Sequence, residues 1–155
     1  MIETFRPLID AAQGVDLTEP KSAQRELERR FSAKGPAALA LGRALGELLE
    51  KQAIANQGAM PVRYGRVAKA TDATSHFSID VVHMNGAGPR HTHPLGEVNF
   101  CIALDGEPRF DGEPPGWVVL PPGSTHVPNV EGGTMLIVYL LPQGKVEFAP
   151  APRAL

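Results

Sequence analysis

The spacing of the apolar residues changes near residue 57 of this 155-residue chain. Before that point apolar side chains recur every three or four residues, as at Ala23, Leu27 and Phe31, which is the pattern of an amphipathic helix. Pro20 and the Gly35-Pro36 pair are typical of helix boundaries. The first third of the chain therefore predicts three helical segments, around residues 5–9, 18–31 and 37–54.

After residue 59 the apolar residues alternate with polar ones, and most of the 16 glycines and 15 prolines lie there. Dipeptides such as Asp105-Gly106 and Asp111-Gly112 are typical of tight turns between antiparallel strands. Such a set closes most naturally into a small β-barrel or jelly roll, because closure removes exposed sheet edges. The predicted strands are 61–69, 76–84, 97–104, 116–120, 134–141 and 145–148.

The length fits one structural domain with two parts. We expect a helical extension over residues 1–57 that packs on the sheet or on another subunit, and a barrel over residues 58–155. The fold class is thus mainly β, with an N-terminal α-helical segment.

Charge and composition exclude several classes of partner. The formal net charge is −2, and no Lys/Arg run is longer than Arg29-Arg30, so we expect no nucleic acid partner. No apolar run reaches the roughly 18 residues of a membrane span, and the first residues lack the plan of a signal peptide. The single cysteine, Cys101, suits a reducing compartment, so a cytoplasmic location is expected.

The stretch HTHPLGE carries the strongest chemical signal of the chain. His91 and His93 are two residues apart, so a strand would point both imidazoles to one face, about 6–7 Å apart along the backbone. A turn at residues 94–96 would bring Glu97 back on the neighbouring strand, and His126 follows a later proline-glycine turn. Three imidazoles and a carboxylate on a rigid scaffold predict a site for one divalent transition metal ion.

These residues resemble the two motifs of the cupin superfamily. The first motif, a glycine, HxH, a glutamate and a later glycine, is matched by Gly86, His91, His93, Glu97 and Gly106. The second motif, a glycine, PxG, a histidine and an asparagine, is matched by Gly116, Pro121, Gly123, His126 and Asn129, with gaps that differ by a residue or two. The resemblance implies a cupin-type barrel with His91, His93, Glu97 and His126 as the metal ligands.

Nearly the whole chain also resembles the 4-hydroxylaminobenzoate lyase family, including its N-terminal helices. The stretches that carry the resemblance include HPLGEVNF, GWVVLPPGSTHVP and YLLPQGKVEF. The resemblance implies conversion of 4-hydroxylaminobenzoate to 3,4-dihydroxybenzoate and ammonium, in the degradation of nitroaromatic acids. It also implies a homodimer, by analogy with other cupins.

An aromatic acid substrate needs a cationic anchor, and Arg63, Arg66 and Arg90 are the candidates. Arg63 and Arg66 are three residues apart, so a regular strand points them to opposite faces and at most one faces the pocket. Strand alternation aims Arg90 away from the metal, because its neighbour His91 faces inward. For each of the three, the alternative interpretation is a solvated arginine on the surface.

Several further side chains are candidates for roles around the substrate. Glu97 and Asn99 should both face the interior, where Asn99 could orient a ligand or the substrate. His83 continues the face of residues 77, 79 and 81 and is a candidate acid or base, or else a buried structural histidine. Trp117 and Tyr139 either contact the aromatic ring or fill the core.

The residues leave two alternatives to a lyase. One is another cupin enzyme, such as an iron or manganese dioxygenase or an isomerase of a small acid. The other is a cupin that binds a small ligand without converting it. The ligand set does not distinguish Fe, Mn, Zn, Ni and Co, because all accept imidazole together with carboxylate.

Overall fold

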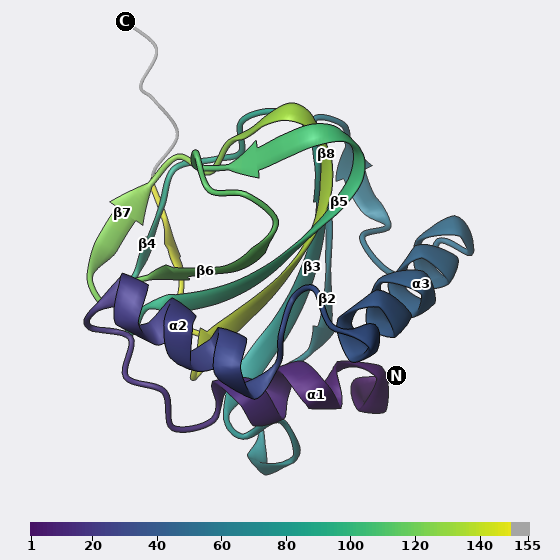
Figure 1. Cartoon of the computed structure of the whole chain (residues 1–155). Coiled ribbons are helices and arrows are strands. Elements are labelled where there is room, and N and C mark those ends of the chain that lie inside the picture. The colour runs from purple at the N-terminus through teal and green to yellow at the C-terminus, as the bar shows by residue number, and fades with distance from the viewer. Residues whose placement is uncertain (150–155) are drawn as a thin grey trace, which may run out of the picture.

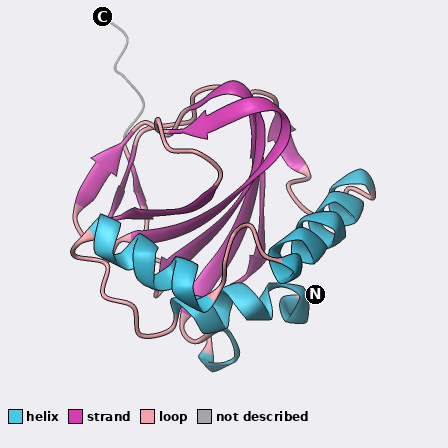
Figure 2. Cartoon of the chain, viewed as in Figure 1, coloured by secondary structure: helices cyan, strands magenta, loops and turns pink. Residues whose placement is uncertain are grey.

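The computed structural model describes residues 1–149, in which three helices precede nine strands (Figures 1 and 2). The expected mainly β fold with an N-terminal helical segment is confirmed. The last six residues of the predicted barrel lie outside the described part of the chain. The helices are α1 (Ile2–Ala12), α2 (Pro20–Arg30) and α3 (Pro36–Glu50), with a 3-10 turn η1 (Asp72–Thr74). The strands are β1 (Gln57–Ala59), β2 (Val62–Ala68), β3 (Phe77–Met84), β4 (His91–His93), β5 (Glu97–Phe110), β6 (Gly116–Leu120), β7 (Ser124–His126), β8 (Val130–Pro142) and β9 (Glu147–Phe148).

The strands form two antiparallel sheets, as expected of a jelly roll. The larger sheet has the order β1-β2-β3-β8-β5-β6, and the smaller has the order β7-β4-β9. One expectation about their connection is wrong. Strand β5, which begins at Glu97, does not pair with β4, because the turn after His93 carries the chain from the small sheet to the large one. Glu97 therefore meets the histidines across the space between the sheets.

Both faces of the large sheet are buried, which decides where its side chains point. On one face, Phe77, Ile79 and Val81 pack in a common core with Leu27 and Leu45 of the helices. The opposite face contributes a second cluster between the two sheets, which includes Val82, Met84, Cys101 and Ile137. The N-terminal helices thus cover the outer face of the sheet and leave its inner face free to build a site (Figure 1).

Strands β5 and β8 are longer than the sequence predicts. Asp105-Gly106 was expected to be a turn, but Gly106 lies inside β5 and pairs with Gly133 of β8. A Cβ atom at either glycine would collide with backbone of the other strand, at the carbonyl oxygens of Gly132 and Asp105. The two strands therefore cross closely and bend only because both positions lack side chains. This explains the later glycine of the first motif.

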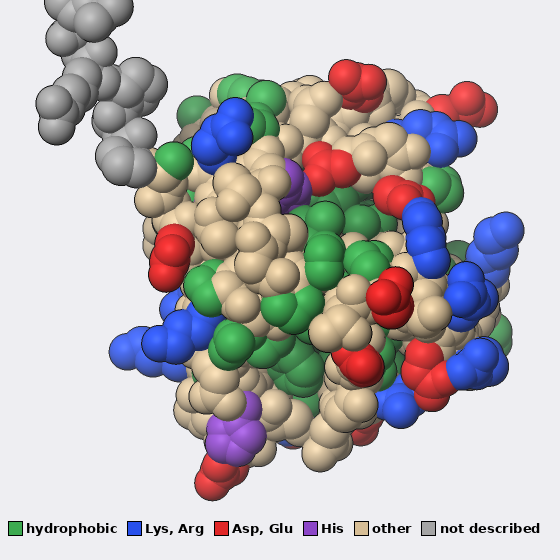
Figure 3. All heavy atoms as spheres, turned by 90° about the vertical axis from the view of Figure 1, so that its left-hand side faces the viewer, with side chains coloured by type: hydrophobic (Ala, Val, Ile, Leu, Met, Phe, Trp, Pro, Cys, Tyr) green, Lys and Arg blue, Asp and Glu red, His purple; other side chains and the backbone are tan. Residues whose placement is uncertain are grey.

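The surface shows no concentration of one charge on the face drawn in Figure 3. Hydrophobic side chains gather near the centre of that face, and Lys and Arg are mixed with Asp and Glu around it. Among the described residues, no helix is long and apolar enough to span a membrane.

Candidate metal centre

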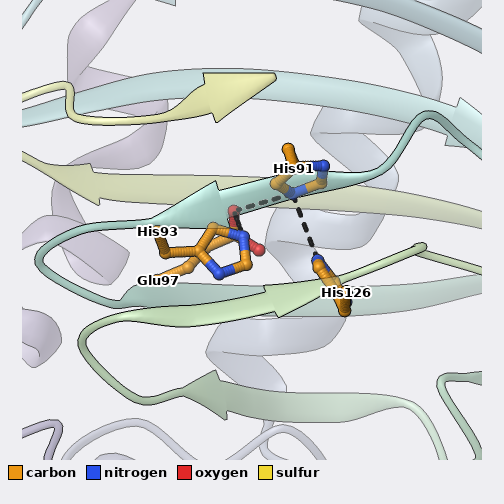
Figure 4. Close-up of side chains that lie close together, drawn as sticks. All are labelled: His91, His93, Glu97 and His126. Carbon is orange, nitrogen blue, oxygen red and sulfur yellow. Dashed lines mark hydrogen bonds and ion pairs between the residues drawn. The ribbon is translucent and has the colours of Figure 1, made fainter. Parts of the chain in front are cut away.

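Four side chains from three strands converge between the two sheets (Figure 4). His91 and His93 lie on β4, His126 is the cross-strand partner of His91 on β7, and Glu97 is the first residue of β5. Their ligand atoms all lie within 4.8 Å of one another. The sequence predicted this set, and the structure brings all four members together.

The protein turns the Nε2 atom of each histidine toward the centre of this cluster. His91 Nδ1 lies 3.0 Å from the carbonyl oxygen of Pro89, and His126 Nδ1 lies 2.6 Å from a carboxylate oxygen of Asp111. Because both partners only accept hydrogen bonds, both Nδ1 atoms carry the proton and both Nε2 atoms present a lone pair. His93 Nδ1 lies 3.1 Å from the hydroxyl of Ser124, a contact that orients the ring, although a hydroxyl can either donate or accept.

Within residues 1–149, three inner atoms of the cluster have no hydrogen-bond partner: His93 Nε2 and both carboxylate oxygens of Glu97. The Nε2 atoms of His91 and His126 are 3.1 Å apart, a separation at which two lone pairs repel each other. His93 Nε2 is 3.0 Å from Glu97 Oε2, yet neither atom makes a hydrogen bond among the described residues. Burial lowers the pKa of His91, which favours the neutral imidazole that ligates metals.

These contacts fit a transition metal ion. Ligands bound at about 2.1 Å and at right angles to one another lie about 3 Å apart, close to the separations seen here. A cation would also satisfy the buried carboxylate of Glu97, whose two oxygens have no hydrogen-bond partner in residues 1–149. The cluster could therefore hold one metal ion.

Asp111 is a functional candidate that the sequence did not reveal. Its Oδ2 atom accepts the hydrogen bond from His126, while its Oδ1 atom accepts one from the backbone N–H of Asn129, at 2.9 Å. It lies 15 residues before His126, in a dipeptide typical of hairpin turns. Only the close approach of the β5–β6 turn to the β7–β8 connection brings the two together.

A cavity of about 670 Å³ adjoins the cluster, with His91 and Glu97 in its wall. Strands β2, β3 and β8 supply the large-sheet side, and Phe148 of β9 supplies part of the other. Two substrate candidates, Arg66 and Tyr139, line this cavity. Arg66 forms a two-point ion pair with Asp80, at 2.9 and 3.2 Å.

Asn99 shares its sheet face with Glu97, as the sequence predicted, but it lies behind the cavity and does not line it. It is 0% exposed, and neither its amide nitrogen nor its amide oxygen has a partner among the described residues. Cys101 lies beside it in the apolar cluster, where burial raises the pKa of the thiol well above its usual range. Cys101 is therefore a packing residue and not a nucleophile.

His83 and Arg63 do not line the cavity, which corrects the candidacy of His83 as an acid or base and leaves Arg66 as the one of the two arginines that faces it. The two residues are direct cross-strand partners, and both point to the face opposite the one that bears Val62, Tyr64 and Arg66. His83 does continue the face of residues 77, 79 and 81, but that face turns toward the helices. Neither residue lines the cavity.

Trp117 and Arg90 also lie away from the cavity. Trp117 packs against Phe31 and Phe100, and its indole N–H donates to the carbonyl oxygen of Phe31 at 2.8 Å. It therefore fills the core beneath α2, which corrects its candidacy as a substrate contact. Arg90 is exposed and precedes the first residue of β4.

A jelly roll that carries three histidines and a glutamate from these two motifs is a cupin with a ligand set that could hold a metal ion. The family model for 4-hydroxylaminobenzoate lyase matches residues 6–148. The chain therefore belongs to the 4-hydroxylaminobenzoate lyase family.

Individual relatives are more distant. The chain is 31% identical over 100 residues to a protein from Nocardioides sp. (strain LMS-CY), and the match covers 59% of each chain. It is 30% identical over 102 residues to a protein from Pseudomonas putida, and this match covers 56% of this chain and 58% of the relative. Both relatives are named 4-hydroxylaminobenzoate lyase, and the chain spans less than two thirds of the length of each. An RmlC-like cupin protein from Ralstonia eutropha is 16% identical, with a TM-score of 0.42 over 59% of this chain and 62% of that one.

Proposed function

We propose that the chain is a metal-dependent lyase that converts 4-hydroxylaminobenzoate and water to 3,4-dihydroxybenzoate and ammonia. In this reaction the N–O bond, the C–N bond and one ring C–H bond of the substrate break and two ring C–O bonds form; the reduction of the nitrogen balances the oxidation of the ring, so no external oxidant or reductant is needed. The proposal also assigns the chain to the degradation of nitroaromatic acids. Its support is membership of the family together with the cluster at the cavity wall.

The observation that carries the proposal is the orientation of the four ligands. His91, His93, Glu97 and His126 would hold the ion, and their Nδ1 partners keep the imidazoles fixed before it binds. When bound, the ion would supply Lewis acidity toward the hydroxylamine oxygen and an activated water. Four protein ligands leave open positions on a six-coordinate ion for such groups.

The other cavity residues would bind the substrate and limit its contact with water. Val82, Met84 and Leu141 give the cavity an apolar wall on the large sheet, which suits a flat aromatic ring. Arg66 supplies a cation on the same wall. Tyr139 keeps its phenolic proton, because burial raises its pKa well above the usual range, so the hydroxyl can donate a hydrogen bond.

The experiment is incubation of the metal-loaded protein with 4-hydroxylaminobenzoate in the absence of oxygen. We expect ammonium and 3,4-dihydroxybenzoate in equal amounts, and loss of both products in His91→Ala and His126→Ala. Oxygen consumption that accompanies turnover would instead identify a dioxygenase. Tight binding of the aromatic acid without any product would identify a binding protein.

We also propose that the protein acts as a homodimer in the cytoplasm. Analytical ultracentrifugation of the purified protein tests the first part, and a single-chain mass at micromolar concentration would refute it.

A further inference from the structure

Four polar residues form a row across the inner face of the large sheet. Arg66 on β2 pairs with Asp80 on β3, Asp80 pairs with Tyr139 on β8, and Tyr139 pairs with Asn99 on β5. Directly paired residues of antiparallel strands point to the same face of a sheet. With strands about 4.8 Å apart, the row extends over about 14 Å from Arg66 to Asn99.

The neighbouring rows show that this arrangement is specific. Two residues along each strand in one direction, the same face carries only Tyr64, Val82, Ile137 and Cys101. In the other direction lie Ser78 on β3, Leu141 on β8 and Glu97, two residues before Asn99 on β5. The polar row therefore crosses a largely apolar wall and ends next to a residue of the metal cluster.

The row runs from the mouth of the cavity to the interior. The exposed fraction falls from 42% for the Arg66 side chain to 20% for that of Asp80, and then to 8% for Tyr139 and 0% for Asn99. A ligand that lies along the row would place one end near solvent and the other end beside Glu97. A rigid ring with polar groups at opposite ends has this shape.

The two ends of the row have unused hydrogen-bonding groups of different kinds. At the inner end, both amide atoms of Asn99 lack partners, and the Tyr139 hydroxyl contacts only the weakly accepting sulfur of Met84, at 3.8 Å. At the mouth, the Nε and Nη2 atoms of Arg66 donate hydrogen bonds to the carboxylate of Asp80. The Nη1 group makes no hydrogen bond within the described residues, so a fixed guanidinium edge faces outward from the ion pair.

We propose that this row determines specificity for aromatic carboxylates with a polar substituent in the para position. Arg66, held in place by Asp80, binds the carboxylate at the mouth, and Tyr139, which lines the cavity together with Glu97, hydrogen-bonds to the para substituent beside the metal cluster. The assignment rests on the proposed function, because it names how the substrate of that reaction lies in the cavity. Asp80 is a positioning residue that acts through Arg66.

Binding of three unreactive probes to the metal-loaded protein tests the row without turnover. The probes are 4-hydroxybenzoate, benzoate and phenol, and calorimetry gives their dissociation constants. Arg66→Gln should weaken the two carboxylates about ten- to hundredfold, as expected for the loss of a charged hydrogen bond, and leave phenol unchanged. Tyr139→Phe should weaken the binding of 4-hydroxybenzoate and phenol but not that of benzoate, because it removes only the hydroxyl from the cavity wall.

Arg63→Gln is the matched control, because Arg63 lies on the same strand as Arg66 and points to the opposite face. It should change none of the three dissociation constants, and thermal melting of each variant reports whether the fold is intact. Equal effects of Arg66→Gln and Arg63→Gln would overturn the proposal, as would failure of the folded wild-type protein to bind 4-hydroxybenzoate. If binding of the probes depends on Arg66 but the protein releases no ammonium from 4-hydroxylaminobenzoate, the proposed role of the row stands and the lyase reaction is refuted. Ammonium release with no dependence on Arg66 would refute the row alone.

Discussion

Replacement of Asp111 should weaken metal binding although Asp111 is not itself a ligand. Its carboxylate accepts the Nδ1–H of His126 at 2.6 Å, which fixes both the tautomer and the direction of the imidazole. Loss of such a partner typically lowers metal affinity about 10- to 100-fold, or about 1.4–2.8 kcal/mol. Asp111→Ala also removes the acceptor of the Asn129 N–H, which should lower the free energy of unfolding by about 1 kcal/mol.

The metal affinity of the Asp111→Asn variant should lie between that of the wild type and that of Asp111→Ala. An amide has one acceptor oxygen, so either His126 or the backbone N–H of Asn129 loses its partner. The assay is competition between the protein and a chelator for Co²⁺ or Zn²⁺, combined with thermal melting of the metal-free protein.

Glu131→Gln provides the matched control for this prediction. Glu131 accepts a hydrogen bond from the side chain of the same Asn129, at 3.0 Å, but has no contact with a histidine. Metal affinity should therefore stay at the wild-type value. Wild-type affinity in Asp111→Ala, or an equal decrease in Glu131→Gln, would show that the carboxylate does not orient His126.

Three further results are expected. Burial and the nearby Arg63 lower the pKa of His83, so an NMR titration should show His83 neutral at pH 7 and Arg63→Gln should raise its pKa. Because the pKa of His83 is lower in the folded than in the unfolded state, His83 should lower the stability of the protein as the pH falls below about 6.5. The melting temperature of His83→Gln should therefore decrease less over this pH range than that of the wild type. Cys101, buried and with a raised pKa, should react with iodoacetamide only after unfolding, as mass spectrometry would show. Asn99→Leu should not lower the melting temperature of the ligand-free protein, because it removes a buried amide that has no partner.

Three of the four ligands could be predicted from the sequence because their spacing is local, and His126, far along the chain, because its stretch resembles the second cupin motif. His91 and His93 are brought to one face by strand alternation alone, and His126 and Glu97 follow turns that the glycines and prolines mark. The sequence did not show that β4 and β5 belong to different sheets. Turn residues indicate where a chain changes direction, but not which strand it pairs with next.

It was harder to predict to which side of the sheet each side chain points than to predict where the strands lie. In β3, Phe77, Ile79 and Val81 alternate with Ser78, Asp80 and Val82, and both sets are at least partly buried. A sheet covered on both sides has no polar face to identify the outside. The sequence therefore left open whether His83 lies in the cavity or in the core, and it did not indicate that Asp80, on the other face, lines the cavity.

Metal content tests the central claim most directly. Elemental analysis of purified protein should find one transition metal ion per chain in the wild type and almost none in His126→Ala, while thermal melting shows the variant to be folded. Production of 3,4-dihydroxybenzoate should decrease in proportion to the metal content. Full turnover by a preparation shown to contain no metal would contradict the account.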